Sequence, residues 1–222
     1  VDAAIVIGCN NTQEEQEDFR YAAEHIPVFI VNGRIDGENI YCSLCDEKSI
    51  ARETVRLFCN AGHPRVLYLY DSQTYSGEMK LSGYYEGMNL YAGCEPMAIL
   101  IDSERGSFFG AADVIEQISG KIEFDAIFSA DDSLAIGAMK ALQKIGRSPI
   151  PTVGFNNTVL GVCASPELTS IDNHLCQQCS IAISSLLSVL RGGKPTQCLT
   201  LKGSLCWRNT FKMNDIQQEK TK

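Results

Sequence analysis

The chain has 222 residues, of which 45% are hydrophobic, so it can bury a sizeable core in one large or two small domains. Its formal net charge of −8, from 19 basic and 27 acidic residues, excludes a general attraction for a polyanion such as DNA. It holds no run of about 18 uncharged apolar residues, which a membrane-spanning helix would require.

Apolar periodicity predicts strands and helices in alternation along the chain. The predicted strands are residues 3–8, 28–31, 66–70, 97–101, 125–129 and 153–155. The predicted helices are residues 14–24, 48–60, 77–92, 111–119, 133–145 and 175–190. Alternation of this kind is typical of an α/β fold, in which helices cover both faces of parallel sheets.

Residues 125–171 are the most informative stretch, because three strand-to-helix junctions there place polar side chains at strand ends. The strand at residues 125–129 is followed by Ala130, Asp131 and Asp132, and then by a helix that stops at Gly146. Asp132 directly precedes the first helical turn, so we expect its carboxylate to be the N-cap. Asp131 would then be free to point into a crevice and bind a ligand hydroxyl.

Several segments resemble, in order, the effector domain of the LacI/GalR family of bacterial transcription regulators. The segment ADDSLAIGAMKALQKIG is similar to the family's AND-x-x-AxGxxxAL motif, and VGFNN and SPELTSI resemble its VGFD and PxLT[ST]I motifs. Upstream, the resemblance continues through VDAAIVIG, IPVFIVN, NAGHPRVLYL and residues 76–84. Together these segments cover nearly the whole chain as far as Arg208.

The resemblance implies a periplasmic-binding-protein-like fold of type I, with two doubly wound parallel-sheet lobes joined by a three-strand hinge. The first lobe would comprise residues 1–61 and 173–201. The second would comprise residues 62–172 and 202–212, with a last strand around residues 205–208 and a polar tail at residues 213–222.

The first predicted strand resembles the third strand of the family's effector domain. We therefore expect a truncated, proteolysed or incomplete chain in which the first lobe lacks two βα units, or roughly 60 residues. Those absent strands would lie at the centre of the lobe's sheet and leave two unpaired edges. The sequence shows no helix-turn-helix, zinc-finger spacing or basic arm, so a DNA-binding headpiece would lie outside it.

The same resemblance implies an effector site in the cleft between the lobes. Its predicted residues are Lys80, Asp131, Asn156, Asn173, Ser76, Asp46 and Phe108. Lys80 stands where the family has an Arg that forks onto sugar hydroxyls. A lysine offers a point charge instead, so the effector could carry a phosphate or carboxylate, or Lys80 could simply lie on a solvated helix face.

In the predicted site, the acidic residue stands at a different position from that of the family's acidic residue. Asp131 takes the place of the family's Asn, and Asn156 takes the place of its Asp. The cleft therefore still holds one carboxylate. This is compatible with a polyol ligand whose hydroxyl groups form hydrogen bonds to planar carboxylate and amide groups, while an aromatic side chain packs against its ring. Phe108 is a candidate for that wall, with ordinary core packing as the alternative.

The ten cysteines include two C-x-x-C pairs, Cys42 with Cys45 and Cys176 with Cys179. Two such pairs can close a tetrahedral zinc site, but these are more than a hundred residues apart and lie in strand-like and helical sequence. We prefer free buried thiols, typical of a reducing cytosol, over a metal site or disulfides.

No residues arranged for catalysis are recognisable, since His25, His63 and His174 have no neighbouring nucleophile. We expect neither an enzyme nor a cofactor, and two binding functions remain. The preferred one is the ligand-sensing and dimerisation domain of a cytoplasmic LacI/GalR-type regulator, homodimeric, with a sugar-like effector, DNA bound only through the headpiece, and no membrane partner. The alternative is a sugar-binding protein of an ABC transporter, which has the same fold.

Overall fold

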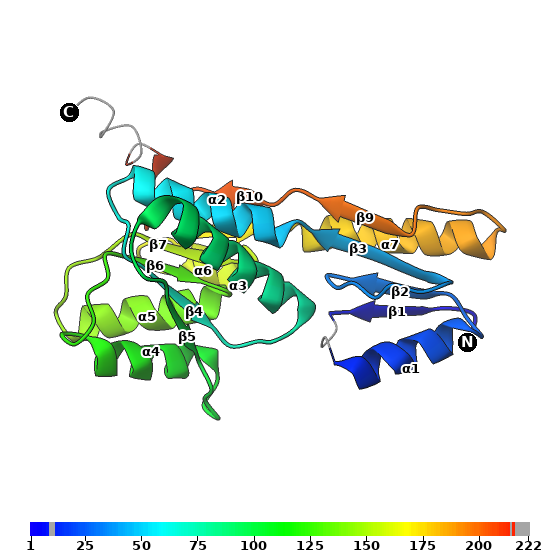
Figure 1. Cartoon of the computed structure of the whole chain (residues 1–222), viewed down its shortest axis with the longest axis horizontal. Coiled ribbons are helices and arrows are strands. Elements are labelled where there is room, and N and C mark those ends of the chain that lie inside the picture. Colours follow the sequence, from blue (N-terminus) through cyan, green and yellow to red (C-terminus); the bar gives the residue numbers. More distant parts are fainter. Residues whose placement is uncertain (9–11, 214, 216–222) are drawn as a thin grey trace. The chain divides into compact units, whose positions relative to one another are not determined.

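The computed structural model describes residues 1–8, 12–213 and 215 and divides the chain into two compact units, each built around one sheet. Unit 1 comprises Val1–Glu47, Gln73–Met79 and Asn173–Gly203. Unit 2 comprises Lys48–Ser72, Lys80–Asp172 and Ser204–Lys222. The chain therefore passes repeatedly from one unit to the other (Figure 1).

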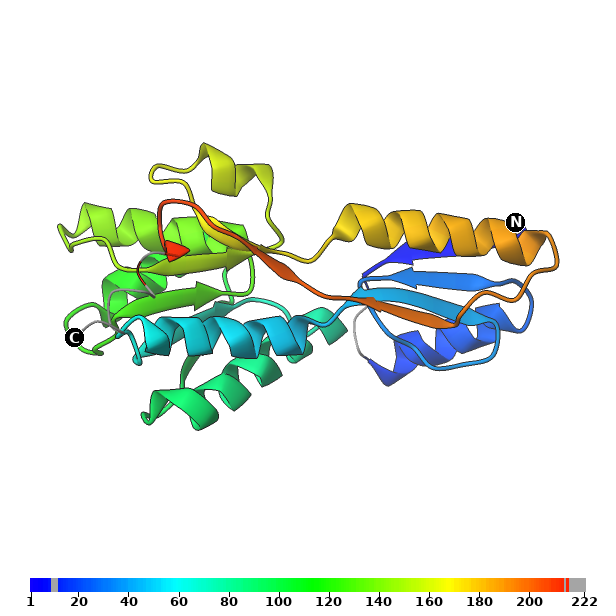
Figure 2. The same cartoon turned by 90° about the horizontal axis from the view of Figure 1, so that it is seen from above.

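Unit 1 contains a four-stranded parallel sheet in the order β1-β2-β3-β9. Its strands are β1 (Ala4–Ile7), β2 (Val28–Val31), β3 (Ile40–Cys45) and β9 (Cys198–Leu201). Helices α1 (Gln13–Ala23) and α7 (Leu175–Leu190) cover opposite faces of this sheet (Figures 1 and 2). Because successive β2 side chains alternate between the faces, Val28 and Ile30 pack on the α1 side and Phe29 on the α7 side.

Unit 2 contains a six-stranded sheet in the order β10-β8-β7-β6-β4-β5. Its parallel strands are β4 (Val66–Tyr70), β5 (Met97–Leu100), β6 (Ala126–Ser129), β7 (Thr152–Phe155) and β8 (Thr169–Asp172). The edge strand β10 (Ser204–Cys206) is antiparallel to β8. The predicted α/β fold with parallel sheets is confirmed, except that this last strand runs in the opposite direction.

The helices of unit 2 form two layers around its sheet. One face carries α2 (Glu47–Asn60) and the part of α3 (Tyr75–Gly87) from Lys80 onward, since the start of α3 belongs to unit 1. Helix α3 continues as the π-helix η1 (Met88–Ala92). The other face carries α4 (Ser107–Ile118) and α5 (Asp132–Lys144), while the short α6 (Val159–Cys163) precedes β8 (Figure 2). The core between these layers contains large, fully buried aromatic side chains such as Tyr68, Phe128 and Phe155.

Two features of unit 1 differ from the sequence-based expectation. Strands β3 and β9 were not predicted, because β3 is buried on both faces and lacks an alternating pattern. The four described strands are hydrogen-bonded in series, so the expectation that the centre of this sheet is missing is wrong.

Helix α2 packs in unit 2, although the expected first lobe extends to residue 61. Ala51, Val55 and Phe58 are fully buried in the unit 2 core. The periodicity of residues 48–60 predicts a helix with one apolar face, but it does not identify the sheet that this face covers.

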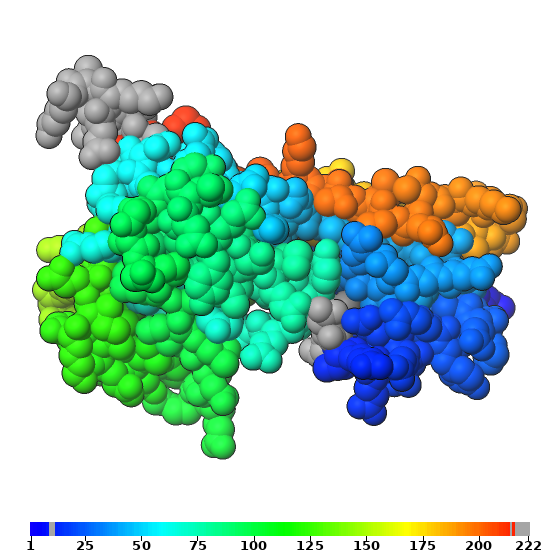
Figure 3. Space-filling view, viewed as in Figure 1, coloured from blue at the N-terminus to red at the C-terminus, as the bar shows by residue number. Residues whose placement is uncertain are grey.

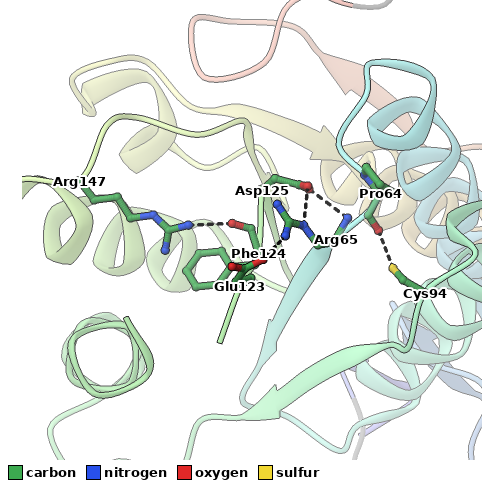
Figure 4. Close-up of polar contacts among 7 residues, drawn as sticks. All are labelled: Pro64, Arg65, Cys94, Glu123, Phe124, Asp125 and Arg147. Carbon is green, nitrogen blue, oxygen red and sulfur yellow. Dashed lines mark hydrogen bonds and ion pairs between the residues drawn. The ribbon is translucent and has the colours of Figure 1, made fainter. Parts of the chain in front are cut away.

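Arg65 joins the amino ends of β4 and β6, and Arg147, which follows α5, contacts the residue Phe124 just before β6 (Figure 4). The backbone N–H and Nε of Arg65 each donate to the Asp125 carboxylate at 3.0 Å, and its guanidinium also pairs with Glu123. Arg147 donates to the Phe124 carbonyl at 2.8 Å and lies 4.3 Å from the centroid of the Phe124 ring. These contacts hold the register in which Val66 faces Ala126.

Helices α4 and α5 approach closely because Gly137 has no side chain. A Cβ atom at Gly137 would lie 2.1 Å from the backbone carbonyl oxygen of Phe108. We expect Gly137→Ala to reduce the free energy of unfolding by about 1–3 kcal/mol, because the helices must move apart. Urea denaturation would measure this change.

Gly161→Ala is the matched control, because its Cβ would meet only side-chain atoms, the nearest at 3.5 Å. We expect no loss of stability there, since alanine favours a helix more than glycine does. Equal unfolding free energies for the two variants would contradict the proposed role of the α4–α5 contact.

Candidate functional site

The polar site of unit 2 is centred on Lys80, which extends from α3 toward the carboxyl ends of β6 and β7. Only 5% of Lys80 is exposed, so it does not lie on a solvated helix face. Its Nζ donates to the Ala130 carbonyl at 3.1 Å and to Asn156 Oδ1 at 3.3 Å. The same ammonium lies 4.2 Å from the centroid of the fully buried Phe155 ring, a cation–π contact.

Asn156 links Lys80 to Asp131. Its Nδ2 donates to Asp131 Oδ2 at 2.9 Å, while its Oδ1 accepts from Lys80. The structure therefore joins three of the predicted site residues in one hydrogen-bonded network. Because β6 and β7 are neighbouring parallel strands, the loops that follow them meet at the same edge of the sheet.

Neither Asp131 nor Asp132 has the role predicted for it from the sequence. Helix α5 begins at Asp132, and Asp131 is its N-cap: Asp131 Oδ1 accepts from Ser133 N at 2.7 Å and from Ser133 Oγ at 2.6 Å. The prediction that Asp132 caps the helix is therefore wrong, and Asp131 does not point freely into a crevice. The helix includes one residue more than its apolar pattern indicates, so the cap moves to the preceding aspartate.

Asp132 is completely buried and holds the β7–α6 turn. Its Oδ2 accepts from Thr158 N at 2.6 Å and Thr158 Oγ1 at 2.8 Å, and its Oδ1 accepts from Ser170 Oγ at 2.6 Å. Burial raises the pKa of this carboxyl above its usual value, and these hydrogen bonds offset only part of that effect.

The turn held by Asp132 contains Asn156 and Asn157, both in the left-handed region at φ 84° and 47°. Asn157 Oδ1 accepts from Arg208 Nη2 at 2.5 Å, and Asn157 Nδ2 donates to Asp172 Oδ2 at 3.2 Å. Sequence reasoning missed Asn157 and Arg208 as site residues. Two consecutive asparagines can indicate a tight turn in a sequence, because asparagine tolerates positive φ. The contact with Arg208 joins segments that are distant in the chain, so the sequence does not reveal it.

Unit 1 carries three of the other predicted residues. Asn173 is 2% exposed and precedes α7, Ser76 is 6% exposed, and Asp46 is half-buried directly after β3. The carbonyl of Asn173 accepts from Gln178 Nε2 at 2.8 Å. The backbone N–H of Asp46 donates to the Leu201 carbonyl at 2.8 Å.

Gln178 is a buried residue that sequence reasoning also missed. Its Oε1 accepts from Asn32 N at 3.0 Å, and its backbone carbonyl accepts from Ser43 Oγ at 2.9 Å. Together with the contact to Asn173, these bonds connect the start of α7 to β3 and to the loop after β2. A glutamine within an otherwise helical pattern has no sequence signature for this role.

Phe108 lies in α4, outside the hydrogen-bonded network of unit 2. Its ring is half-buried and packs edge-on against Phe109, with 5.1 Å between the ring centroids. The ring that contacts Lys80 is that of Phe155, which is fully buried.

A separate cavity of about 500 Å³ lies near the carboxyl end of α5 and the amino end of β7. Its lining includes Met139, Leu142, Pro149 and Thr152, and none of the three networked residues. Within the part of the chain that the structure describes, no three His, Cys, Asp or Glu side chains are grouped to hold a metal ion. No helix in that part is long and apolar enough to cross a membrane.

Residues 55–211 match the periplasmic binding protein-like domain family, to which this chain therefore belongs. An HTH-type transcriptional regulator from Lachnoclostridium phytofermentans is 32% identical over 218 residues, covering 95% of this chain and 65% of that protein. The HTH-type transcriptional regulator AscG of Escherichia coli is 24% identical over 189 residues, covering 83% of this chain and 56% of that protein. The chain spans less than two thirds of the length of either relative.

A solved structure shows the same fold. It is a sugar-binding transcriptional regulator of the LacI family from Escherichia coli, complexed with phosphate, and it superposes with a TM-score of 0.81. The two sequences are 22% identical, and the superposition covers 95% of this chain and 77% of that one. The predicted resemblance to LacI/GalR-type regulators is confirmed.

The buried Asp132 carboxyl makes the stability of unit 2 depend on pH. Since its pKa is raised in the folded protein, its contribution to stability falls as pH rises from the unfolded value of 3.8 through the folded value. In Asp132→Asn this titration is absent. We therefore expect the stability advantage of the wild type over Asp132→Asn to shrink as the pH rises from about 4.

Urea denaturation of both proteins over a series of rising pH values would measure the difference. The exposed Asp102→Asn serves as a control for the loss of one carboxyl group. A wild-type advantage over Asp132→Asn that stays constant with pH would contradict the assignment.

Proposed function

We propose that this chain is the effector-sensing and dimerisation part of a LacI/GalR-type transcription regulator. The network of buried Lys80 with half-buried Asn156 and Asp131 carries this proposal, because it presents oriented carboxylate and amide groups where parallel strands end. That edge of an open α/β sheet is the usual place for a small-molecule site. The names of the relatives support a regulatory role and do not favour the transporter alternative.

The orientation of Asn156 is the central feature of this site. The Lys80 ammonium donates to Asn156 Oδ1, which turns the amide nitrogen toward the carboxylate of Asp131. Ser133 fixes the other oxygen of that carboxylate. An effector would therefore meet polar groups whose directions are already set, which reduces the entropy that binding must remove.

These contacts favour an uncharged polyol over a phosphate or carboxylate. Lys80 is buried and already donates to Ala130 and Asn156, so we propose that it orients Asn156 and does not bind an anionic group directly. The neighbouring carboxylates of Asp131 and Asp132 would also repel an anion. A sugar, or a similar ligand with paired hydroxyl groups, fits planar donors and acceptors of this kind.

Regulation would follow from a difference in effector affinity between conformational states of the protein. A coupling free energy of about 1–3 kcal/mol would change DNA affinity by about 5-fold to about 150-fold. We propose that DNA is bound through a headpiece outside this chain, that the regulator is a homodimer in the cytoplasm, and that no membrane partner takes part. The proposed binding role requires no catalytic residue, metal ion or cofactor.

Effector binding should depend on Lys80 and Asp131. In a thermal-shift screen of the full-length protein against sugars, sugar phosphates and nucleosides, we expect an uncharged polyol to raise the melting temperature. Asp131→Asn should weaken the binding of that ligand by about 10-fold to about 150-fold, the effect of losing one hydrogen bond to a charged group. Lys80→Met should also weaken it, because Asn156 loses the donor that orients its amide.

Glu78→Gln is the matched control, since Glu78 is exposed on the same helix as Lys80. It should bind the same ligand with unchanged affinity. A ligand whose affinity survives both site substitutions would place binding elsewhere, and a sugar phosphate that binds more tightly than its parent sugar would contradict the orienting role of Lys80.

The full-length protein should sediment as a dimer at micromolar concentration, because most soluble homo-oligomers close as symmetric pairs and a dimer is the expected assembly of this family. Sedimentation velocity over a dilution series would measure the association. A monomer throughout the series would refute the proposed dimerisation role and leave the effector site to be judged by the ligand screen.

A further inference from the structure

Two cysteines distant in the sequence are direct partners in the unit 1 sheet. Cys42 on β3 pairs with Cys198 on β9 in a parallel ladder. Neighbouring strands lie about 4.7–4.9 Å apart, and paired residues of a parallel ladder direct their side chains to the same face. This separation falls within the range of about 4.4–6.8 Å between the Cα atoms of a disulfide.

Burial confirms that the two side chains share one environment. Cys42 is 7% exposed and belongs to the apolar cluster formed with Val28, Ile30 and Leu44, and Cys198 packs against this same cluster. The C-x-x-C spacing of the sequence is misleading here, because Cys45 lies three residues along the strand and faces the opposite side. The register partner of Cys45 is Leu201.

The two thiols differ in their access to solvent. Cys198 is half-buried on β9, an edge strand of the described sheet, whereas Cys42 Sγ lies inside, 3.6 Å from the Ile35 carbonyl. The segment around β9 lies at the surface in the space-filling view (Figure 3, orange). A reagent from solvent would therefore meet Cys198 first, with Cys42 placed to react second.

We propose that Cys42 and Cys198 form a reversible disulfide site whose oxidant is a small disulfide such as oxidised glutathione. The Cys198 thiolate attacks one sulfur of glutathione disulfide, forms a mixed disulfide and releases one glutathione thiolate. The Cys42 thiol then loses its proton and attacks Cys198 Sγ, which releases the second glutathione. One protein disulfide is formed and one glutathione disulfide is reduced to two thiols.

The consequence is a covalent connection between an edge strand and its neighbour. Strand β9 is held in the described sheet by β3 alone, and both strands end shortly before the chain enters unit 2, at Lys48 and at Ser204. Oxidation would restrict fraying of β9, and reduction would restore it. A disulfide of this kind in a reducing compartment is typical of redox sensing and not of a permanent cross-link.

The test is oxidation of the folded full-length protein with glutathione disulfide, followed by trypsin digestion without reductant and mass spectrometry. The expected product is a cross-linked pair of peptides, residues 35–48 with residues 192–202, which dithiothreitol separates. Since residues 35–48 contain both Cys42 and Cys45, variants are needed to show which of the two is bonded to Cys198. Cys42→Ser and Cys198→Ser should each abolish the cross-link, whereas the matched control Cys45→Ser should retain it.

Each other outcome would overturn the proposal. A cross-link that persists in Cys42→Ser would assign the partner to Cys45. A wild-type protein that yields only glutathione adducts, other cysteine pairs or unmodified peptides would show that the two thiols do not react together. Formation of the cross-link in urea but not in the folded protein would show that it does not come from the β3–β9 ladder. Circular dichroism of each variant would verify that it is folded.

Discussion

The buried carboxylate of Asp132 is the constraint on which the candidate site of unit 2 depends. It connects the start of α5 with Thr158 in the β7–α6 turn and with Ser170 on β8. Asn156 and Asn157, which directly precede Thr158, have backbones in the left-handed region. Asparagine adopts this conformation only at some cost in free energy. The same aspartate thus stabilises the turn that brings Asn156 to Lys80 and Asp131. A charge in this position is unfavourable by itself, and three donors make it tolerable.

In unit 1, the buried side-chain amide of Gln178 likewise holds loops in place. The Gln178 side chain connects the first turns of α7 with Asn173 on one side and with the loop after β2 on the other. Both units therefore hold the loops at the carboxyl ends of their strands with polar side chains that are completely buried. Buried polar groups must find their hydrogen-bond partners inside the protein, so each permits only a narrow set of loop conformations.

Lys80 illustrates why the chemistry of a site does not follow from a residue type at a matched position. A lysine in place of an arginine can bind a ligand anion, lie on a solvated surface or contact other groups inside the protein. Only the surroundings of the side chain distinguish these three roles. Burial against Phe155 and donation to Asn156 assign the internal role in the proposed site. The change in expected ligand, from an anion toward an uncharged polyol, follows from that assignment.

The sequence by itself determined the fold class, the order of most elements and three members of the candidate network. Strands β2 and β4 and helix α7 have the predicted limits, because apolar periodicity reports which side chains are buried within one element. Tertiary structure decided the placement of α2 in unit 2, the strands β3 and β9, the N-cap role of Asp131 and the internal role of Asp132. It also decided the pairings of Arg208 with Asn157 and of Cys42 with Cys198. These features depend on contacts between residues distant in the chain, which no local pattern of hydrophobicity or spacing encodes.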